Sequence, residues 1–435
     1  MKHFELLLCP EKILLYKEGK FIVETEKVVG VKEGRIDYIG PFSQDLKAQK
    51  IIKLERHLLS PGLVNTHTHL PMSLFRGLAD DLPLKSWLED YIFPLEANVV
   101  DQNFISVGTR LSAIELIKSG VTSFFDMYFY NEVMAQALDE AGLRAFVGVG
   151  VPSVEKDSME WKKKTKDLKQ KYEGHSRINI AIAPHAPYTL TSKCLKEIGD
   201  FSKKESLPLT IHVSESEWEQ QEIQKKYGRT PVQYLHDLNV TGEQALFVHC
   251  VYVNEEDLKI MSKTGTSFSY NPESNMKLSN GIAPVGEALK QGVVVGLGTD
   301  GSASNNNLNL FQEMDTGIKL QSLKYKDQSL DAQQMFQMAT LGGAKALGLE
   351  KDIGTIEEGK RADLIAIELE HAHLYPPHNL VSHLVYSAQG SEVSFVMCEG
   401  RILMENHQLQ TLNAGGIYEE ASLIEKKIKS FLNSR

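Results

Sequence analysis

Eight apolar segments recur along the middle of the chain, and this repetition constrains the fold more than any other feature. Each is followed by a stretch with helical spacing; the first is LLSPGLVNTHTH, from residue 58, and the last is VVVGLGTDG, from residue 293. Near-continuous apolar runs are typical of parallel strands that are covered on both faces. Eight strand–helix units favour closure into a barrel over an open sheet. We therefore predict an α/β fold with a (β/α)₈ TIM barrel over residues 59–358.

The two ends of the chain have a different sequence pattern from the middle, with short β-rich runs in place of strand–helix repeats. Residues 1–58 contain short β-rich runs punctuated by Gly30 and Gly34, and residues 359–435 return to short strands such as ADLIAIEL. The C-terminal segment EEASLIEKKIKSFLNS has apolar residues at helical spacing. We predict that both ends combine into one small β-sandwich domain, with a closing helix.

Composition excludes several classes of partner. The 435 residues are 42% hydrophobic and carry a formal net charge of −10, which argues against nucleic acid as a partner. The four cysteines form no CxxC pair, so they indicate neither a thiolate zinc site nor a disulfide framework. No apolar run approaches the ~20 residues of a membrane span, and the N-terminus lacks the features of a signal peptide. We expect a cytoplasmic protein that acts on a small molecule without a membrane partner.

Residues of the metal-ligand type recur at the ends of the predicted strands. His67 and His69 are two residues apart at the end of the first barrel strand, so their imidazoles can point to one side. Barrel enzymes assemble their active sites at these strand ends. Any one of these histidines could instead be a buried core residue that bonds only to the backbone. Because ligand-type residues recur at five strand ends, this alternative is disfavoured. The residues at the other four strand ends are His185, His212, His249 and Asp300.

Nitrogen and oxygen ligands without thiolate suit Zn²⁺ or Fe²⁺. We predict one divalent metal ion, with Zn²⁺ as the first choice and Fe²⁺ as the alternative. Such an ion lowers the pKa of a bound water from about 15.7 to about 7. The predicted metal ligands are His67, His69, His212 and Asp300.

Three residues are predicted to move protons. Glu215, three residues after His212, is placed to take a proton from water and deliver it to a ring nitrogen. The alternative is a purely structural role, in which Glu215 lies at the start of a helix and interacts with the positive end of the helix dipole. His249 is expected to orient or deprotonate the water, and Asp300 to pass a proton to the leaving group.

These residues lie in motifs that resemble the amidohydrolase superfamily, and specifically its 5′-methylthioadenosine/S-adenosylhomocysteine deaminase branch. The motifs are NTHTHLPM, PHAPYT, IHVSE, VHC and GLGTDGSASNN, with the closing segment GTIEEGKRADLIAI. The resemblance spans nearly the whole chain. It implies hydrolytic deamination of the 6-amino group of an adenine nucleoside, such as methylthioadenosine, S-adenosylhomocysteine or adenosine, to the inosine analogue and ammonia. Many binuclear members have a carboxylated lysine on strand four, where this chain has His185, so one metal is implied.

The resemblance also implies substrate contacts. Trp87 and Glu96 in the long first loop would meet the nucleoside, Glu96 by accepting hydrogen bonds from ribose hydroxyls. The ordinary alternatives are a tryptophan that packs and a glutamate that is solvated. Residues elsewhere in the chain are expected to contact the substrate as well, namely His185, Glu215, Asp300 and Ser304.

One position departs from the branch. Better-known members carry an arginine near the end of strand three, where this chain has Val149. Arginine is the usual clamp for a carboxylate, because its planar fork matches both oxygens. We therefore expect methylthioadenosine or adenosine to be preferred over S-adenosylhomocysteine.

Other interpretations stay open. The same metal chemistry could act on guanine, cytosine, a pterin or an s-triazine. A non-catalytic scaffold barrel is the alternative of a different class; it would be expected to lose ligands or the acid and to purify without stoichiometric metal. The cytidine-deaminase fold is excluded because the chain has no CxxC. A homo-oligomer is compatible with the sequence, although no segment identifies an interface.

Overall fold

In the computed structural model, which describes residues 2–151, 158–326 and 330–434, the eight apolar segments form a closed barrel. The strands are parallel and follow one another in chain order, and the last pairs with the first at Leu297 and Asn65. Strand β7 is buried along its whole length, as expected for a strand covered on both faces. The barrel prediction is confirmed. The strands are β6 Leu63–Thr68, β7 Val121–Tyr128, β8 Arg144–Val151, β9 Ile178–Pro184, β10 Leu209–Val213, β11 Ala245–His249, β12 Ser267–Tyr270 and β13 Val295–Leu297.

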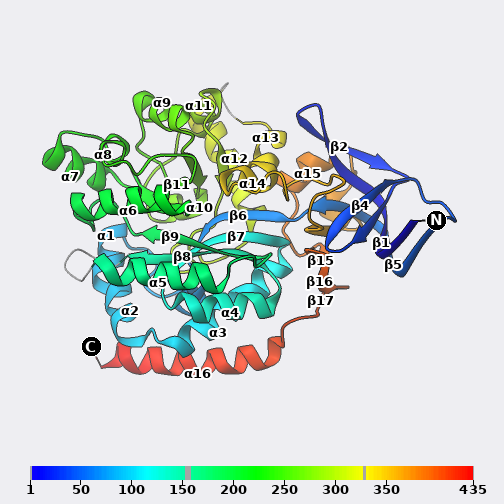
Figure 1. The fold of residues 1–435 in the computed structure, drawn as a ribbon, viewed down its shortest axis with the longest axis horizontal. Helices are drawn as coiled ribbons and strands as arrows, with labels where there is room; N and C mark the ends of the chain where they lie inside the picture. Colours follow the sequence, from blue (N-terminus) through cyan, green and yellow to red (C-terminus); the bar gives the residue numbers. More distant parts are fainter. Residues whose placement is uncertain (1, 152–157, 327–329, 435) are drawn as a thin grey trace.

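Helices surround the barrel (Figure 1). Local sequence defines their ends. For example, Asn254 caps α9 by accepting a hydrogen bond from the backbone of Asp257, and Gly265 ends this helix with a φ of 75°. The helices that follow the second to eighth strands are α4 Asn131–Ala141, α5 Ser158–Lys171, α6 Ser192–Glu205, α7 Glu217–Tyr227, α8 Pro231–Asp237, α9 Glu255–Thr264, α10 Pro272–Lys277, α11 Val285–Lys290 and α12 Leu310–Tyr325.

The connection from β6 to β7 is longer than a single helix. It begins directly after the histidine pair and contains several short turns before the long helix α3. This connection carries Trp87 and Glu96, so its path determines what lies over the end of the barrel. Its elements are η1 Leu70–Phe75, α1 Leu84–Ser86, η2 Trp87–Ile92, α2 Phe93–Val99 and α3 Gln102–Lys118.

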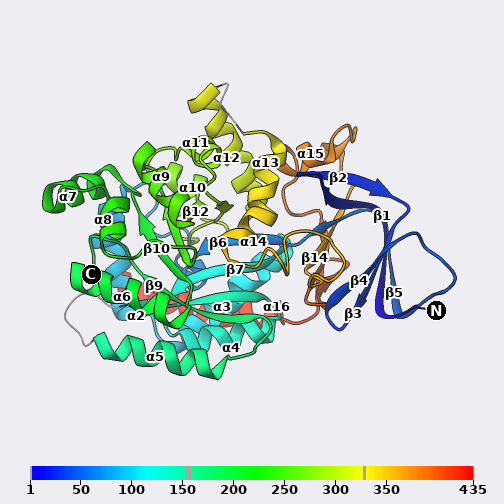
Figure 2. The same ribbon diagram turned by 45° about the horizontal axis from the view of Figure 1, so that its top comes forward.

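Both chain ends contribute to a separate nine-stranded sheet, as predicted (Figure 2). Its order is β17-β16-β15-β14-β5-β1-β3-β4, with β2 paired to β1. The N-terminal and C-terminal parts meet where β14 pairs antiparallel with β5. The strands are β1 Lys2–Lys17, β2 Lys20–Thr25, β3 Val28–Lys32, β4 Arg35–Gly40, β5 Leu46–Pro61, β14 Leu364–Glu368, β15 Val393–Cys398, β16 Arg401–Glu405 and β17 Gln408–Leu409.

The C-terminal helix lies along the barrel. Its apolar face buries Ile417, Ile424 and Ile428, and the helix packs against α3 and α2. Lys427 fixes it further through an ion pair with Asp101, at 2.7 Å. The remaining elements are α13 Ala332–Gln337, η4 Met338–Gly342, α14 Gly343–Ala346, η5 Ala372–Leu374, α15 Leu380–Tyr386 and this helix, α16 Ala414–Asn433.

Two further findings concern the expectations from composition. All four cysteines are unpaired, and Cys250 and Cys398 are buried. Within the described part of the chain, none of the helices combines the length and the apolar character that a membrane crossing requires.

Candidate metal centre and active site

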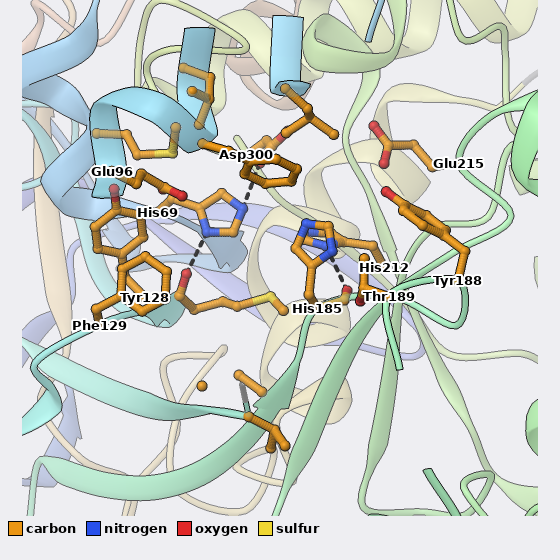
Figure 3. Close-up of a pocket in the computed structure, with 18 of the residues that line it drawn as sticks. His69, Glu96, Tyr128, Phe129, His185, Tyr188, Thr189, His212, Glu215 and Asp300 are labelled. Carbon is orange, nitrogen blue, oxygen red and sulfur yellow. Dashed lines mark hydrogen bonds and ion pairs between the residues drawn. The ribbon is translucent and has the colours of Figure 1, made fainter. Parts of the chain in front are cut away.

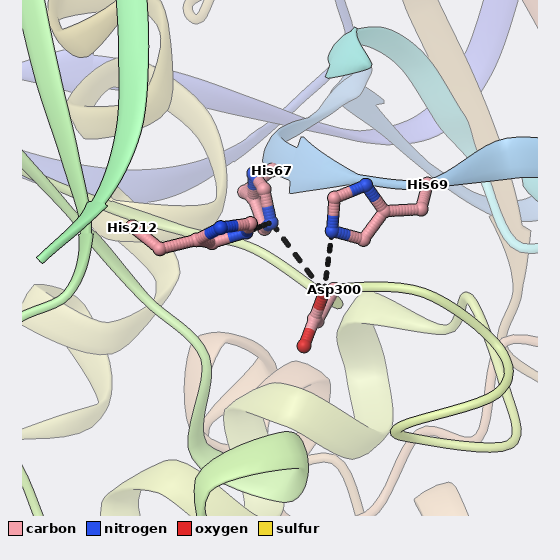
Figure 4. Close-up of side chains that lie close together, drawn as sticks. All are labelled: His67, His69, His212 and Asp300. Carbon is pink, nitrogen blue, oxygen red and sulfur yellow. Dashed lines mark hydrogen bonds and ion pairs between the residues drawn. The ribbon is translucent and has the colours of Figure 1, made fainter. Parts of the chain in front are cut away.

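Four side chains from three strand ends converge at the carboxyl end of the barrel (Figure 4). One donor atom each of His67, His69, His212 and Asp300 lies within 4.8 Å of the others. Nε2 of His67 is 3.1 Å from Nε2 of His212, and Oδ1 of Asp300 is 3.2 Å from Nε2 of His69. Lone pairs held this close in a buried site repel one another unless a cation or a proton lies between them. Three imidazoles and a carboxylate form a donor set that fits a divalent metal ion.

Backbone carbonyls set the tautomers of two of these histidines. Nδ1 of His69 donates to the carbonyl oxygen of Met127 at 2.5 Å. Nδ1 of His212 donates to the carbonyl oxygen of His185 at 2.8 Å. A neutral imidazole with its hydrogen on Nδ1 presents a lone pair at Nε2, and Nε2 is the atom that faces the cluster. The backbone therefore prepares both rings to act as ligands.

The carboxylate of Asp300 is held from behind. Its Oδ2 accepts hydrogen bonds from the hydroxyls of Ser274, at 2.6 Å, and Ser304, at 2.8 Å. Its backbone has a φ of 61°, and its N–H donates to the carbonyl oxygen of His67 at 2.9 Å. A non-glycine residue in this left-handed region is strained, which often marks functional sites. Ser304 therefore reaches the site through Asp300 and does not line the cavity described below.

A cavity of about 770 Å³ opens over the metal cluster (Figure 3). Its size falls within the range of sites that enclose small ligands. Most of its wall is apolar or aromatic, and its ionisable lining residues include His69, Glu96, His185, His212, Glu215, His249 and Asp300. Figure 3 shows Glu96 and Glu215 on opposite sides of the clustered histidines. A molecule that spans the cavity can therefore meet both carboxyl groups at once.

Glu215 and His249 face each other beside the cluster. Oε1 of Glu215 lies 3.8 Å from Nε2 of His249, and both side chains are buried and line the cavity. Burial raises the pKa of Glu215 above its usual value. A carboxylate whose pKa is raised binds a proton more strongly than an ordinary carboxylate does, which favours its acting as a base. The pair is suited to general acid–base chemistry.

A second glutamate fixes the backbone beneath Glu215. The two carboxylate oxygens of Glu219 accept hydrogen bonds from the N–H groups of Ser214, at 3.0 Å, and Glu215, at 2.8 Å. Burial raises the pKa of Glu219 to about 8. Glu219 is not among the site residues predicted from the sequence, although it lies one helical turn after Glu215.

The first loop places Trp87 and Glu96 in the cavity wall. Trp87 is buried, and Glu96 is half-buried. Burial raises the pKa of Glu96 to about 7, while the hydroxyl of Tyr128 and the ring of His69 act in the opposite direction. Glu96 is not freely solvated, whereas Trp87 packs in the hydrophobic core and lines the cavity as well.

His185 also lines the cavity, next to a metal-cluster residue. Its ring centroid is 5.1 Å from that of His212, and its Nδ1 is buried without a hydrogen-bond partner among the described residues. Burial lowers the pKa of His185 to about 4, so the ring is neutral at pH 7. A neutral ring can donate a hydrogen bond to a ligand from one nitrogen and accept one at the other.

Val149 is buried in strand β8 and does not line the cavity. The next two residues, Gly150 and Val151, form that part of the wall. Among the described residues, Lys164 on α5 is the only lysine or arginine that lines the cavity. The described residues in this part of the wall are therefore the apolar Gly150, Val151 and Trp161 together with the charged Glu160 and Lys164.

Comparisons with known proteins agree with this geometry. The 5-methylthioadenosine/S-adenosylhomocysteine deaminase of Thermoanaerobacter pseudethanolicus is 39% identical, over 98% of this chain and 99% of its own length. The 5′-deoxyadenosine deaminase of Methanothermobacter thermautotrophicus is 42% identical over 93% of each chain.

Solved structures show the same architecture. An adenosine deaminase from Xanthomonas campestris with bound zinc superimposes with a TM-score of 0.95 and 31% identity, over 99% of both chains. Atrazine chlorohydrolase from Arthrobacter aurescens, 20% identical, shares the fold with a TM-score of 0.90, over 97% of this chain and 100% of its own. A sequence model of the amidohydrolase family matches residues 58–403. On these grounds, the chain belongs to the amidohydrolase family.

Proposed function

We propose that this protein catalyses the metal-dependent hydrolytic deamination of an adenine nucleoside at its 6-amino group, giving the inosine analogue and ammonia. The observation that carries the proposal is the placement of Glu215 and His249 beside a three-histidine, one-aspartate cluster on the floor of a nucleoside-sized cavity. Relatives that align over nearly the whole chain are named as deaminases of such nucleosides.

The proposed cofactor is a single divalent ion, Zn²⁺ in the first place and Fe²⁺ as the alternative, held by the four cluster residues. When bound, such an ion lowers the pKa of a water to about 7 and so supplies a nucleophile. Strand β9 contains no lysine, which supports one ion rather than a lysine-bridged pair.

The proposed proton path uses three side chains. Glu215 takes a proton from water and delivers it to a ring nitrogen of the purine, which makes C6 more electrophilic. His249, facing Glu215, orients the water or accepts its proton. Once water has added to C6, Asp300 takes the second proton of that water from the new C6 hydroxyl and passes it to the amino group, which leaves as ammonia when the C6–N bond breaks and a C6 carbonyl forms. Water thus adds to C6 and ammonia departs.

The proposed substrate contacts lie on the other side of the cavity. Glu96 would accept hydrogen bonds from the ribose hydroxyls, with Trp87 and His185 in the surrounding wall. Ser304 would act by holding Asp300, which is its hydrogen-bond partner. The unpaired cysteines support the cytoplasmic location that we propose.

Glu96 gives a prediction about pH. Because its pKa is raised to about 7, the carboxylate loses its charge as the pH falls below this value. A charged acceptor binds hydroxyls more strongly than a neutral one. We expect kcat/KM for adenosine to rise with pH through about 7. Glu96→Gln should lower kcat/KM about ten-fold and should abolish its rise with pH near 7. With 2′,3′-dideoxyadenosine, which lacks the hydroxyls, the two proteins should differ little; an equal loss on both substrates would refute a ribose contact.

The wall around Gly150 and Val151 gives a prediction about substrate preference. Because none of the described residues that line this part of the cavity is an arginine, we expect kcat/KM for methylthioadenosine to exceed that for S-adenosylhomocysteine about ten-fold or more. The measurement is the absorbance change of adenine conversion with both substrates. A clearly higher value for S-adenosylhomocysteine would contradict this preference and would identify Lys164 as the candidate partner of its carboxylate.

Two alternatives have tests of their own. Deamination or dechlorination of another heterocycle predicts turnover of guanine, cytosine, a pterin or an s-triazine and none of adenosine. A scaffold role predicts protein without stoichiometric metal. The oligomeric state is a separate question that sedimentation of the purified protein answers.

A further inference from the structure

One short segment contacts all three side chains of the proposed proton path. It comprises α10 and the residues after it, 272–280, and we call it the α10 segment. The hydroxyl of Ser274 donates to Oδ2 of Asp300 at 2.6 Å. The side chains of Asn275 and Asn280 reach the other two members of the path, His249 and Glu215.

The contact of Asn275 determines which nitrogen of His249 carries the hydrogen. Oδ1 of Asn275 lies 2.8 Å from Nδ1 of His249. An amide oxygen can only accept, so Nδ1 donates. Nε2 then keeps its lone pair, and this is the atom that faces Glu215 at 3.8 Å. Asn275 thus leaves His249 able to accept a proton on the side of the reaction.

The contact of Asn280 fixes the carboxyl group of Glu215. Nδ2 of Asn280 donates to Oε1 of Glu215 at 3.0 Å, and Oε1 is the oxygen nearest to His249. Both side chains are almost fully buried, so water does not compete for this hydrogen bond. The amide therefore restricts the rotation of the carboxyl group and leaves its second oxygen free to face a substrate.

The backbone of the α10 segment is itself held in place. The N–H of Asn275 donates to the carbonyl oxygen of Asn271 at 3.0 Å, and the N–H of Asn280 donates to that of Asn275 at 2.8 Å. On its outer side, Lys277 forms an ion pair with Asp80 of the first loop at 2.6 Å. The segment is therefore fixed by hydrogen bonds within its backbone and by an ion pair to the first loop.

We propose that Ser274, Asn275 and Asn280 are positioning residues that align Asp300, His249 and Glu215 for proton transfer. This inference rests on the roles proposed above for those three residues. It differs from a purely structural role, because it predicts a loss in the chemical step and not in substrate or metal binding.

The first test replaces each asparagine by leucine, which has a similar size and no hydrogen bond. Asn275→Leu and Asn280→Leu should each lower kcat about 10–100-fold, the range expected when one buried hydrogen bond to a reacting group is lost, with KM and metal content within two-fold of the parent protein. Asn275→Asp keeps an acceptor and should recover at least ten-fold over Asn275→Leu. Met276→Leu, on the exposed face of α10, is the matched control and should leave kcat unchanged.

The second test asks whether Asn280 acts through Glu215. In a Glu215→Gln background, measured with enzyme in excess over substrate, Asn280→Leu should cause little further loss, because the side chain that Asn280 aligns can no longer carry a proton. If the double variant loses activity by the product of the two single losses, the proposal is overturned. It is also overturned if both leucine variants keep the kcat of the parent protein, or if their kcat falls only in proportion to lost metal. If Asn280→Leu does not fold, Asn280→Asp removes the donor in the same volume and is measured in its place.

The result for Glu215→Gln alone distinguishes failure of the proposed proton path from failure of the positioning role. If Glu215→Gln stays active, the proposed proton path is wrong. If Glu215→Gln is inactive but the leucine variants behave like the parent protein, the path stands and the positioning role is refuted.

Discussion

Glu215→Gln should lower kcat for an adenine nucleoside about 10²–10⁴-fold, the range typical of a lost general acid–base group. Glutamine keeps the shape of the side chain and its capacity to accept from Asn280, but it cannot carry a proton between water and a ring nitrogen. KM and the metal content should change little, because Glu215 is not one of the four clustered donors. Steady-state kinetics and metal analysis of the same preparation measure these three quantities.

The matched control for this variant is Glu217→Gln. Glu217 lies two residues further along, at the start of α7, and it does not line the cavity. Its kcat should equal that of the parent protein. If both variants were equally active, the carboxyl group of Glu215 would have no part in the reaction.

Removal of the metal should have an equally large effect. Chelation should abolish turnover, and added Zn²⁺ or Fe²⁺ should restore it, because the proposed nucleophile depends on the ion. The unloaded protein should also unfold at a lower temperature, since a ligand that binds only the folded state stabilises it. His212→Ala should prevent both the metal uptake and the recovery of activity.

His378→Ala provides the control for that experiment, because His378 is exposed and lies outside the cluster. It should bind metal and turn over substrate like the parent protein. Full activity of metal-free protein, or of His212→Ala without bound metal, would refute the metal-dependent mechanism.

The barrel could be predicted because the requirement for its strands, an apolar sequence, is visible within each short segment. A parallel strand covered on both faces must be apolar throughout, and segments such as VTSFFDMYF meet that requirement. The pairing within the sheet of the chain ends could not be read in the same way. The parallel alignment of β1 with β5, for instance, joins residues far apart in the sequence, and only packing decides their register.

The metal cluster could be predicted because active-site residues of barrel enzymes lie at the carboxyl ends of the strands. His67, His69, His212 and Asp300 all lie at the carboxyl ends of barrel strands, which meet at one end of the molecule. The same rule could not find Ser274, Asn275 or Asn280. They follow β12, whose nearby acid, Glu273, accepts hydrogen bonds from Asn307 and Thr316 and is not part of the cluster. Their own contacts depend on how α10 lies against its neighbours. The signal that was available is the polar run NPESN directly after that strand.

The proposed deamination of an adenine nucleoside is tested most directly by the conversion of methylthioadenosine by the purified, zinc-loaded protein. The measurement combines the ultraviolet shift from adenine to hypoxanthine with an assay of released ammonia. We expect one ammonia per nucleoside converted, and neither signal from Glu215→Gln within the same time. Absence of both signals with methylthioadenosine, S-adenosylhomocysteine and adenosine, despite stoichiometric bound metal, would contradict the account and would direct the search to guanine, pterins and triazines.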